Sequence, residues 1–279
     1  MAIRTTEVIK KALVTAPFLL VPGSSAAIAD SCRPAQFDAQ VSVRYVHDGD
    51  TVHLRDGRKL RIIGINTPER ARDEQPAEPY AGAARRQLQA YADGPWSLVY
   101  DQQRRDRYGR LLAHVFDRQG RNITRRLLAA GAGQLLVFPP NLKFVDCYRR
   151  AQQTARRAQR GLWALSTYQP LSTAQLSTAN AEGYRLVRGR LTRIGESRSS
   201  LWLNLGEDFA LRIARSELEY FERRQIEAWR RQPLLAQGWI YRRSSQWRMR
   251  LRHPAALLEG TDQAPLAKPR GMRHHGHSR

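Results

Sequence analysis

The stretch Val46-His-Asp-Gly-Asp-Thr-Val52, continued by Arg61-Ile-Ile-Gly-Ile-Asn-Thr-Pro-Glu69, decides how the first half of the chain folds. Alternating apolar residues predict β-strands at 51–54 and 58–65. Between them, Asp56-Gly57 is the two-residue signal of a tight hairpin. The second predicted strand therefore returns along the first, and the segment that follows it comes back towards the acidic residues.

The acidic residues of this stretch predict a cation site. Asp48 and Asp50 are two residues apart, so on an extended chain both carboxylates lie on one face. The returning segment adds further oxygen-bearing side chains, namely Asn66, Thr67 and Glu69. Carboxylate, amide and carbonyl oxygens suit calcium or magnesium, and the stretch has no Cys or His cluster that would suit zinc.

Working outward, the same patterns predict two β-barrels. In the first half the predicted strands are 41–45, 51–54, 58–65, 96–100 and 111–116, the predicted helices are 80–91, 123–130 and 142–160, and 70–79 is a charged loop. Five short strands with a helix after the third describe a small OB-type Greek-key barrel, here with two further helices. In the second half the predicted strands are 184–194, 201–205, 209–213, 234–241 and 246–253, with a helix at 215–231. The fold class is therefore α+β, an OB-type barrel followed by a second, smaller OB-like β domain.

The predicted domains are 1–29, a signal peptide; 30–165, the first barrel; 166–182, a linker; 183–259, the second barrel; and 260–279, a disordered basic tail. Bases at Arg4, Lys10 and Lys11, an apolar run at 12–21 and the small-residue site Ala27-Ile-Ala29 are typical of a secretory signal. The apolar run is too short for a membrane span. We expect export to the periplasm or the medium; an N-terminal anchor or a disordered arm is the alternative.

Export also affects how the two cysteines are interpreted. Cys32 and Cys147 are the only thiols, and an even number in an oxidising compartment favours a disulfide between them. Two unpaired buried thiols are the alternative.

The net charge of the chain indicates a polyanionic partner. It is +22 at pH 7, and arginine supplies most of it. Such a field attracts nucleic acid first, because the guanidinium fork matches phosphate geometry, and anionic membrane or cell-wall polymers second. We expect DNA or RNA as partner and a monomer without a protein partner.

Four blocks of the first half resemble the staphylococcal nuclease (thermonuclease) family in order and spacing. They are Asp48-Gly-Asp-Thr-Val52, Arg61-x-x-x-x-Asn-Thr-Pro-Glu69, Asp106-Arg-Tyr-Gly-Arg110 and Arg160-Gly-Leu-Trp163. The resemblance covers about residues 41–165. It implies a nuclease that hydrolyses phosphodiester bonds of DNA or RNA.

The resemblance also implies roles for individual residues. Calcium would be bound by Asp50, Asn66 and the carbonyl of Thr67. The remaining implied residues are the general base Glu69, the phosphate-binding Arg61 and Arg110, and the substrate-binding Asp106, Arg107 and Tyr108. Chemistry agrees with this set, because hydroxide attack makes the phosphate more negative, and a divalent ion with two guanidinium groups would stabilise that charge. Each residue also has an ordinary structural interpretation, such as a surface ion pair or a hairpin tip.

One departure from the family pattern leaves two functions open. Where the family more often has Asp, this chain has Asn66, which contributes no charge to a cation site, so another divalent ion can replace calcium. The first hypothesis is an exported calcium-dependent nuclease. The alternative is a catalytically weak nucleic-acid-binding protein with tandem OB-like barrels. A secreted protein that binds envelope polymers explains the charge but not the four blocks.

The aromatic residues of the second half have two interpretations. They lie at strand spacing, which favours the core, but interleaved arginines would also suit stacking platforms for bases. The aromatic residues concerned are Trp202, Phe209, Trp229, Trp239, Tyr241 and Trp247.

Overall fold

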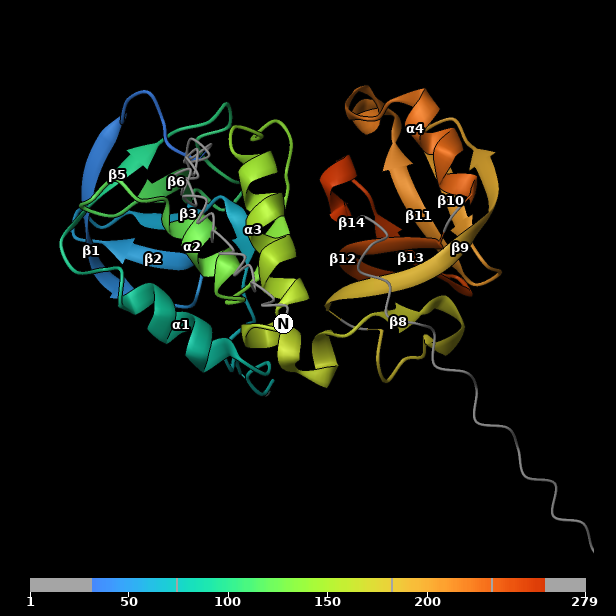
Figure 1. Ribbon diagram of the computed structural model, residues 1–279, viewed down its shortest axis with the longest axis horizontal. Coiled ribbons are helices and arrows are strands. Elements are labelled where there is room, and N and C mark those ends of the chain that lie inside the picture. Colours follow the sequence, from blue (N-terminus) through green and yellow to red (C-terminus); the bar gives the residue numbers. More distant parts are fainter. Residues whose placement is uncertain (1–31, 74, 182, 232, 259–279) are drawn as a thin grey trace, which may run out of the picture. The chain divides into compact units, whose positions relative to one another are not determined.

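The computed structural model describes residues 32–73, 75–181, 183–231 and 233–258, and it contains two five-stranded barrels (Figure 1). The predicted signal peptide and basic tail lie outside the described residues. This mixed α and β architecture confirms the predicted fold class.

The first barrel is closed by five strands in the order β1-β2-β3-β6-β5. Its strands are β1 (Ala39–Val46), β2 (Thr51–Leu54), β3 (Lys59–Ile62), β5 (Pro95–Val99) and β6 (Leu111–Phe116). β3 and β6 run parallel, and the other neighbours are antiparallel. Helix α1 (Ala81–Gln89) connects the third barrel strand to the fourth, as the OB arrangement requires.

The strand predicted at 58–65 is divided in two. Gly64 has φ +90°, and a Cβ at this position would overlap the ring of Tyr148. The chain therefore leaves the barrel after β3 and forms a separate strand, β4 (Gly64–Asn66), which pairs with β7 (Gln134–Leu136). This change of direction carries Thr67 towards Asp50, which lies just before the start of β2.

Two helices pack beside the first barrel. Asn122 caps α2 (Ile123–Ala129) by accepting a hydrogen bond from the N–H of Arg125. α3 (Val145–Arg157) is shorter than the helix predicted at 142–160, and Cys147 on it forms a disulfide with Cys32.

The ends of α2 and α3 meet through two glycines. The N–H of Leu162 donates to the carbonyl of Gly131, and a Cβ on Gly131 or Gly161 would overlap the backbone of the other segment. Trp163, in the same block, is buried. The block Arg160-Gly-Leu-Trp163 therefore serves helix packing.

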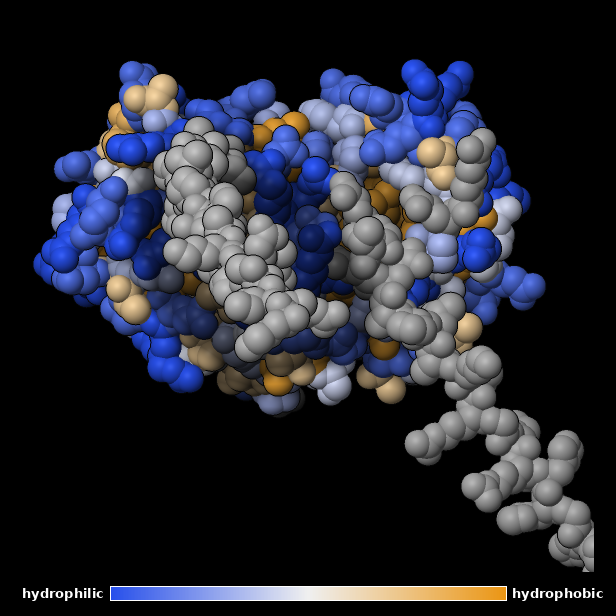
Figure 2. All heavy atoms as spheres, in the orientation of Figure 1, coloured by the Kyte–Doolittle hydropathy of each residue, from blue (hydrophilic) through white to orange (hydrophobic). Residues whose placement is uncertain are grey.

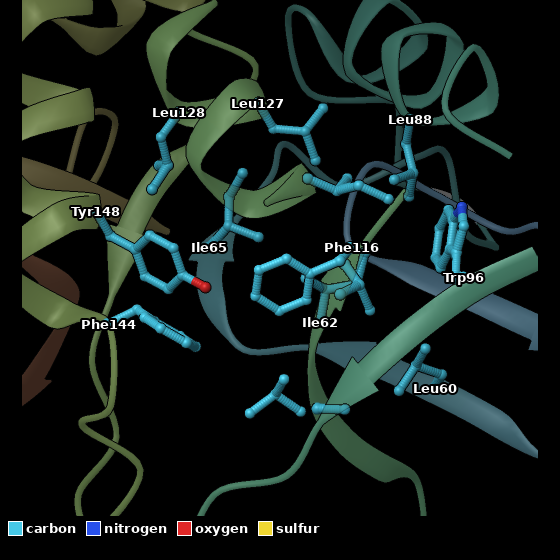
Figure 3. Packing of buried hydrophobic residues seen from close by; sticks show 14 of the residues in the cluster. Leu60, Ile62, Ile65, Leu88, Trp96, Phe116, Leu127, Leu128, Phe144 and Tyr148 are labelled. Carbon is cyan, nitrogen blue, oxygen red and sulfur yellow. The ribbon is translucent and has the colours of Figure 1, made fainter. Parts of the chain in front are cut away.

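The first core lies between the barrel wall and these helices. Figure 3 shows Ile62 and Phe116 from the barrel facing Leu127 of α2 and Tyr148 of α3. All four are almost completely buried. This packing fixes the strands whose ends carry the acidic residues.

The second barrel repeats the strand order of the first. Its strands are β9 (Tyr184–Glu196), β10 (Ser200–Leu205), β11 (Phe209–Ala214), β12 (Pro233–Arg243) and β13 (Gln246–Arg250). They follow the order β9-β10-β11-β13-β12, and β12 pairs with β9 to close the barrel. The parallel pair is again the third strand with the fifth. The helix predicted at 215–231 is reduced to α4 (Arg223–Ala228) between 3-10 turns at 215–220 and 229–231.

Two short strands outside the second barrel extend its sheet. β8 (Leu171–Ser172) pairs with β9, and β14 (Leu257–Leu258) pairs with β12. Short 3-10 turns at 166–168 and 173–175 flank β8. The predicted domain boundaries, including the linker, stay a prediction.

Buried hydrogen bonds connect the second barrel to the elements beside the first. Gln237 on β12 donates to the carbonyl of Leu135 (3.0 Å) and accepts from the amide of Gln152 on α3 (3.1 Å). The hydroxyl of Tyr184 donates to the same carbonyl (2.7 Å).

The surface in view is mostly hydrophilic (Figure 2). Within the described ranges, no helix has the length and apolar character needed to cross a membrane.

Candidate active site

Asp50 is the centre of the candidate site. It lies just before β2 and is 5% exposed. Its Oδ2 accepts hydrogen bonds from the backbone N–H (2.9 Å) and the hydroxyl (3.0 Å) of Thr67. Its Oδ1 accepts a bond from the hydroxyl of Thr51 (3.0 Å) and lies 3.2 Å from Nε of Arg61. A carboxylate has about four acceptor positions, so these contacts hold Asp50 in one orientation.

Strand register explains why these groups meet. Thr51 of β2 lies opposite Arg61 of β3, and the N–H of Ile62 donates to the carbonyl of Asp50. Arg61 also donates through Nη1 to the carbonyl of Ile62 (2.6 Å), and only 13% of its side chain is exposed. The guanidinium is therefore held beside Asp50 from two directions.

Asp48 is a second buried carboxyl beside Asp50. Its Oδ1 accepts from the N–H of Asp50 (2.9 Å), which closes the turn through Gly49. A Cβ on Gly49 would lie 2.7 Å from Cγ2 of Thr67, so glycine permits this close approach. Burial, and then the negative charge of Asp50, raise the pKa of Asp48 to about 7. Two close buried carboxyls are a negative centre that a cation would stabilise.

Glu69 lies at the exposed rim, three residues beyond β4. Its backbone N–H donates to Oε2 of Glu78 (2.8 Å), and the N–H of Glu78 donates to the carbonyl of Glu69 (2.9 Å). Loss of water around its carboxyl, and then the charge of Asp50, raise the pKa of Glu69, while Arg61 opposes the shift. The charges of Asp50 and Arg61 therefore both act on the carboxyl of Glu69.

Glu78 is the residue of this region that sequence reasoning missed. It lies in the segment 70–79, for which the sequence predicts only a charged loop, and it anchors the backbone of Glu69. No pattern in the sequence marks it, because its contact depends on how the loop returns.

Asn66 ends β4 opposite Gln134 of β7 and is half-buried. Among the described residues, its side-chain amide has no hydrogen-bond partner. Its amide oxygen, like the carboxylate oxygens of Asp48 and Asp50, is a donor of the kind that suits a hard divalent cation. Within the part of the chain that the structure describes, no group of three or more His, Cys, Asp or Glu residues forms a metal site by itself.

Arg110 is held by Asp106 in the hairpin loop before β6. Oδ2 of Asp106 accepts from Nε of Arg110 (2.7 Å), and Oδ1 accepts from the N–H of Arg110 and the N–H of Tyr108 (both 2.9 Å). The guanidinium of Arg110 lies 5.5 Å from the centre of the Tyr108 ring, and that of Arg107 lies 4.7 Å from it. Tyr108 itself is 66% exposed.

The register of β3 and β6 relates Arg110 to Arg61. Arg61 lies opposite Leu112, and the alternating residues Leu60 and Leu111 point into the core. Because every second residue of a strand shares a face, Leu112 lies on the outer face that carries Arg61, and Arg110 lies two residues before Leu112 in the loop that precedes β6. The structure thus brings Asp50, Arg61, Thr67 and Glu69 together and places Arg110 in the loop immediately before the adjacent strand, β6.

Comparison with known proteins identifies the family. The family model described as "Staphylococcal nuclease homologue" matches residues 59–165. A thermonuclease of Staphylococcus hyicus is 34% identical over 127 residues, which are 43% of this chain and 72% of that protein. The endonuclease YncB of Bacillus subtilis is 33% identical over 127 residues, and the chain spans 60% of its length. On these grounds the chain belongs to the staphylococcal nuclease family.

Proposed function

We propose that the chain is an exported nuclease that uses a divalent cation, calcium or another, to hydrolyse phosphodiester bonds of DNA or RNA. The observation that carries the proposal is the cluster around Asp50. Arg61 and Thr67 hold its carboxylate, and its charge also acts on Glu69. The printed names of the relatives, thermonuclease and endonuclease, support it.

Asp50, the amide of Asn66 and the carbonyl of Thr67 would hold the cation. When bound, the cation would polarise the phosphate and offset its growing negative charge. The donor set favours an oxygen-seeking ion, and the neutral amide of Asn66 leaves the choice between calcium and another divalent ion open.

The residues of the chain would divide the remaining work. Arg61 and Arg110 would bind the non-bridging phosphate oxygens, because guanidinium forks match that geometry. Glu69, at the open rim, would take the proton of the attacking water. Asp106 would position Arg110 through its two hydrogen bonds, and Arg107 and Tyr108 would contact the bound strand.

Hydrolysis assays test the proposal. Single- and double-stranded DNA and RNA are offered to the purified protein with calcium, magnesium or a chelator. We expect cleavage that a chelator abolishes and that Glu69→Gln reduces at least about a hundredfold, because a general base contributes about that much. Glu222→Gln, which removes an exposed acid next to α4, is the matched control and should cleave like the wild type.

Binding without cleavage under every metal condition would instead favour the alternative function, a catalytically weak nucleic-acid-binding protein with tandem barrels.

A further inference from the structure

Four neighbouring strands of the second barrel, β10, β11, β13 and β12, carry residues on the outside of its curved wall. The residues of these strands that point into the core are Leu203 on β10, Leu211 on β11, Met249 on β13 and Ile240 on β12. Because side chains alternate along a strand, the residues between them point outward.

The strand register aligns the outward residues in two rows. Trp202 lies opposite Arg212, Arg212 opposite Arg250, and the pairing of Ile240 with Met249 puts Trp239 beside Arg250. The first row, from β10 to β12, is Trp202, Arg212, Arg250 and Trp239. The second row is Asn204, Ala210, Arg248 and Tyr241. With strands about 4.8 Å apart, each row follows roughly 14 Å of the barrel wall, which curves because β12 pairs with β9 to close the barrel.

We call this surface the Trp202 face: Trp202, Arg212, Arg248, Arg250, Trp239 and Tyr241. The guanidinium of Arg248 lies 4.8 Å and that of Arg212 5.9 Å from the centre of the Trp202 ring. Both arginines thus pack over Trp202.

The charges of Arg212 and Arg248 are not balanced by acids. Arg212 donates to the hydroxyl of Ser200 (2.8 Å), and Arg248 donates to the amide oxygen of Gln246 (3.1 Å). Both partners are neutral, and among the ion pairs of the described ranges neither arginine has a carboxylate. Arg250, by contrast, is paired with Glu217. Two positioned guanidinium groups therefore remain for an anion.

The aromatic side chains of β12 on this surface are partly exposed, and the ring of Trp239 also packs against Tyr184 (4.8 Å between ring centres) and Phe138 (6.1 Å). Trp239 is 44% and Tyr241 38% exposed, whereas Phe209 and Trp229 are buried in the core. The structure thus separates the aromatic residues of this half into core residues and residues of the outer face.

A ligand for the Trp202 face must offer flat apolar surfaces and regularly spaced negative charges. A single nucleic-acid strand offers both, since each unstacked base has a π-face and each nucleotide carries one phosphate. A duplex keeps its bases stacked inside, so its phosphates alone would meet the face. The face of the second and third strands of an OB barrel, here β10 and β11, is also a general position for oligonucleotides.

We propose that the Trp202 face binds single-stranded nucleic acid, by base stacking on Trp202, Trp239 and Tyr241 and by phosphate contacts from Arg212 and Arg248. If the bound nucleic acid is also the substrate of the candidate active site, that part of the inference rests on the proposed function. The binding itself does not.

Anisotropy of a labelled oligothymidylate, titrated with the full chain in chelator at several salt concentrations, tests the proposal. Arg212→Gln with Arg248→Gln should flatten the slope of log K against log salt by about 1.4, or ~0.7 for each phosphate released. Trp202→Ala should weaken binding roughly tenfold without changing the slope, and Trp202→Phe should restore most of the affinity.

The matched control is Arg223→Gln with Arg224→Gln, which removes two exposed charges from α4, outside the face. Equal losses for the two arginine pairs would overturn the proposal. So would equal binding of an abasic strand, or wild-type affinity in Trp202→Ala.

Hydrolysis of a dinucleotide separates this proposal from the function of the active site. Variants of the Trp202 face should cleave a dinucleotide like the wild type. If the wild type fails to cleave but binding depends on Trp202, the proposed function falls and the binding face stands. If the wild type cleaves and binding is independent of Trp202, the binding face falls and the proposed function stands.

Discussion

At the scale of single residues, Asn66 provides a test of the proposed cation site. It stands at the end of β4, and under the proposed function its neutral amide would bind the cation together with the carboxyl of Asp50 and the carbonyl of Thr67. Asn66→Asp adds one negative charge, so we expect calcium affinity to rise roughly tenfold, about 1.4 kcal/mol. Calorimetric titration of calcium measures it. Unchanged affinity would argue against Asn66 as a ligand, and Asp50→Asn, which removes a charge, should have the opposite effect.

The buried side chain of His114 should make the stability of the fold depend on pH. Its Nδ1 lies 2.9 Å from the hydroxyl of Tyr148, and its Nε2 lies 3.3 Å from Oδ2 of Asp101. Since a carboxylate only accepts, the neutral ring carries its proton on Nε2 and accepts from Tyr148. Burial lowers the pKa of His114, although the bond to Asp101 opposes the shift.

The stability of the fold should therefore fall on acidification. The unfolded chain takes up a proton on this histidine near pH 6.5, and the folded chain only at lower pH. The contribution of His114 is thus complete above about pH 6.5 and is lost as pH falls through the folded pKa. Denaturant unfolding between pH 7.5 and 5 should show a shallower pH dependence for His114→Gln, by up to about 1.4 kcal/mol per pH unit. Parallel curves would contradict the assignment.

At the scale of elements, the loop before β6 positions Arg110. Asp106→Asn removes the carboxylate that receives Nε of Arg110, so we expect nuclease activity to fall roughly tenfold to a hundredfold with a stability loss below about 1 kcal/mol. Cleavage rate and thermal melting measure the two effects.

A second hairpin supplies the control. Asp56, at the turn between β2 and β3, makes the same kind of contact with Arg58 (2.6 Å). Asp56→Asn should therefore leave cleavage unchanged. If both substitutions slow cleavage equally, the loss of activity comes from disturbing a hairpin and not from the loss of the contact between Asp106 and Arg110.

Elements governed by nearby residues were predictable from the sequence. The strands at 51–54 and 111–116 have the predicted bounds because their patterns alternate and turns flank them. The prediction failed where distant residues decide the structure. Tyr148 on α3 occupies the space beside Gly64 and so divides the predicted strand.

The helix predicted at 215–231 failed for a related reason. Glu217 is buried in ion pairs with Arg250 and Arg252, at and beyond the end of β13, and its segment forms 3-10 turns instead of an α-helix.

For the candidate site, the predicted hairpin at Asp56-Gly57 was enough to indicate that Thr67 returns towards Asp50, although the change of direction at Gly64 was not predicted. Glu78 escaped prediction because its bonds to the backbone of Glu69 depend on the path of an irregular loop. The roles of the site residues stay predictions until the variants are assayed.

At the scale of the whole molecule, the disulfide ties the start of the described chain to α3. Cys32 and Cys147 are separated by 115 positions, and the chain-entropy model gives a loop of this size about 4–5 kcal/mol. Cys32→Ser with Cys147→Ser should lower the unfolding free energy by about that amount. Denaturant unfolding measures it, with chemically reduced wild type as control. Equal stability of oxidised and reduced protein would refute the estimate.

The contact between Gly131 and Gly161 bears on how relatives of this chain are recognised. Its block lies within residues 59–165, the part that the family model matches, whereas Asp48 and Asp50 lie before it. A homologue that kept the two glycines but lost Asp50 would still be detected as a relative, yet it would lack the carboxyl proposed for cation binding. A search for active nucleases among such homologues should therefore examine the position of Asp50 and not the glycines at the contact between α2 and α3.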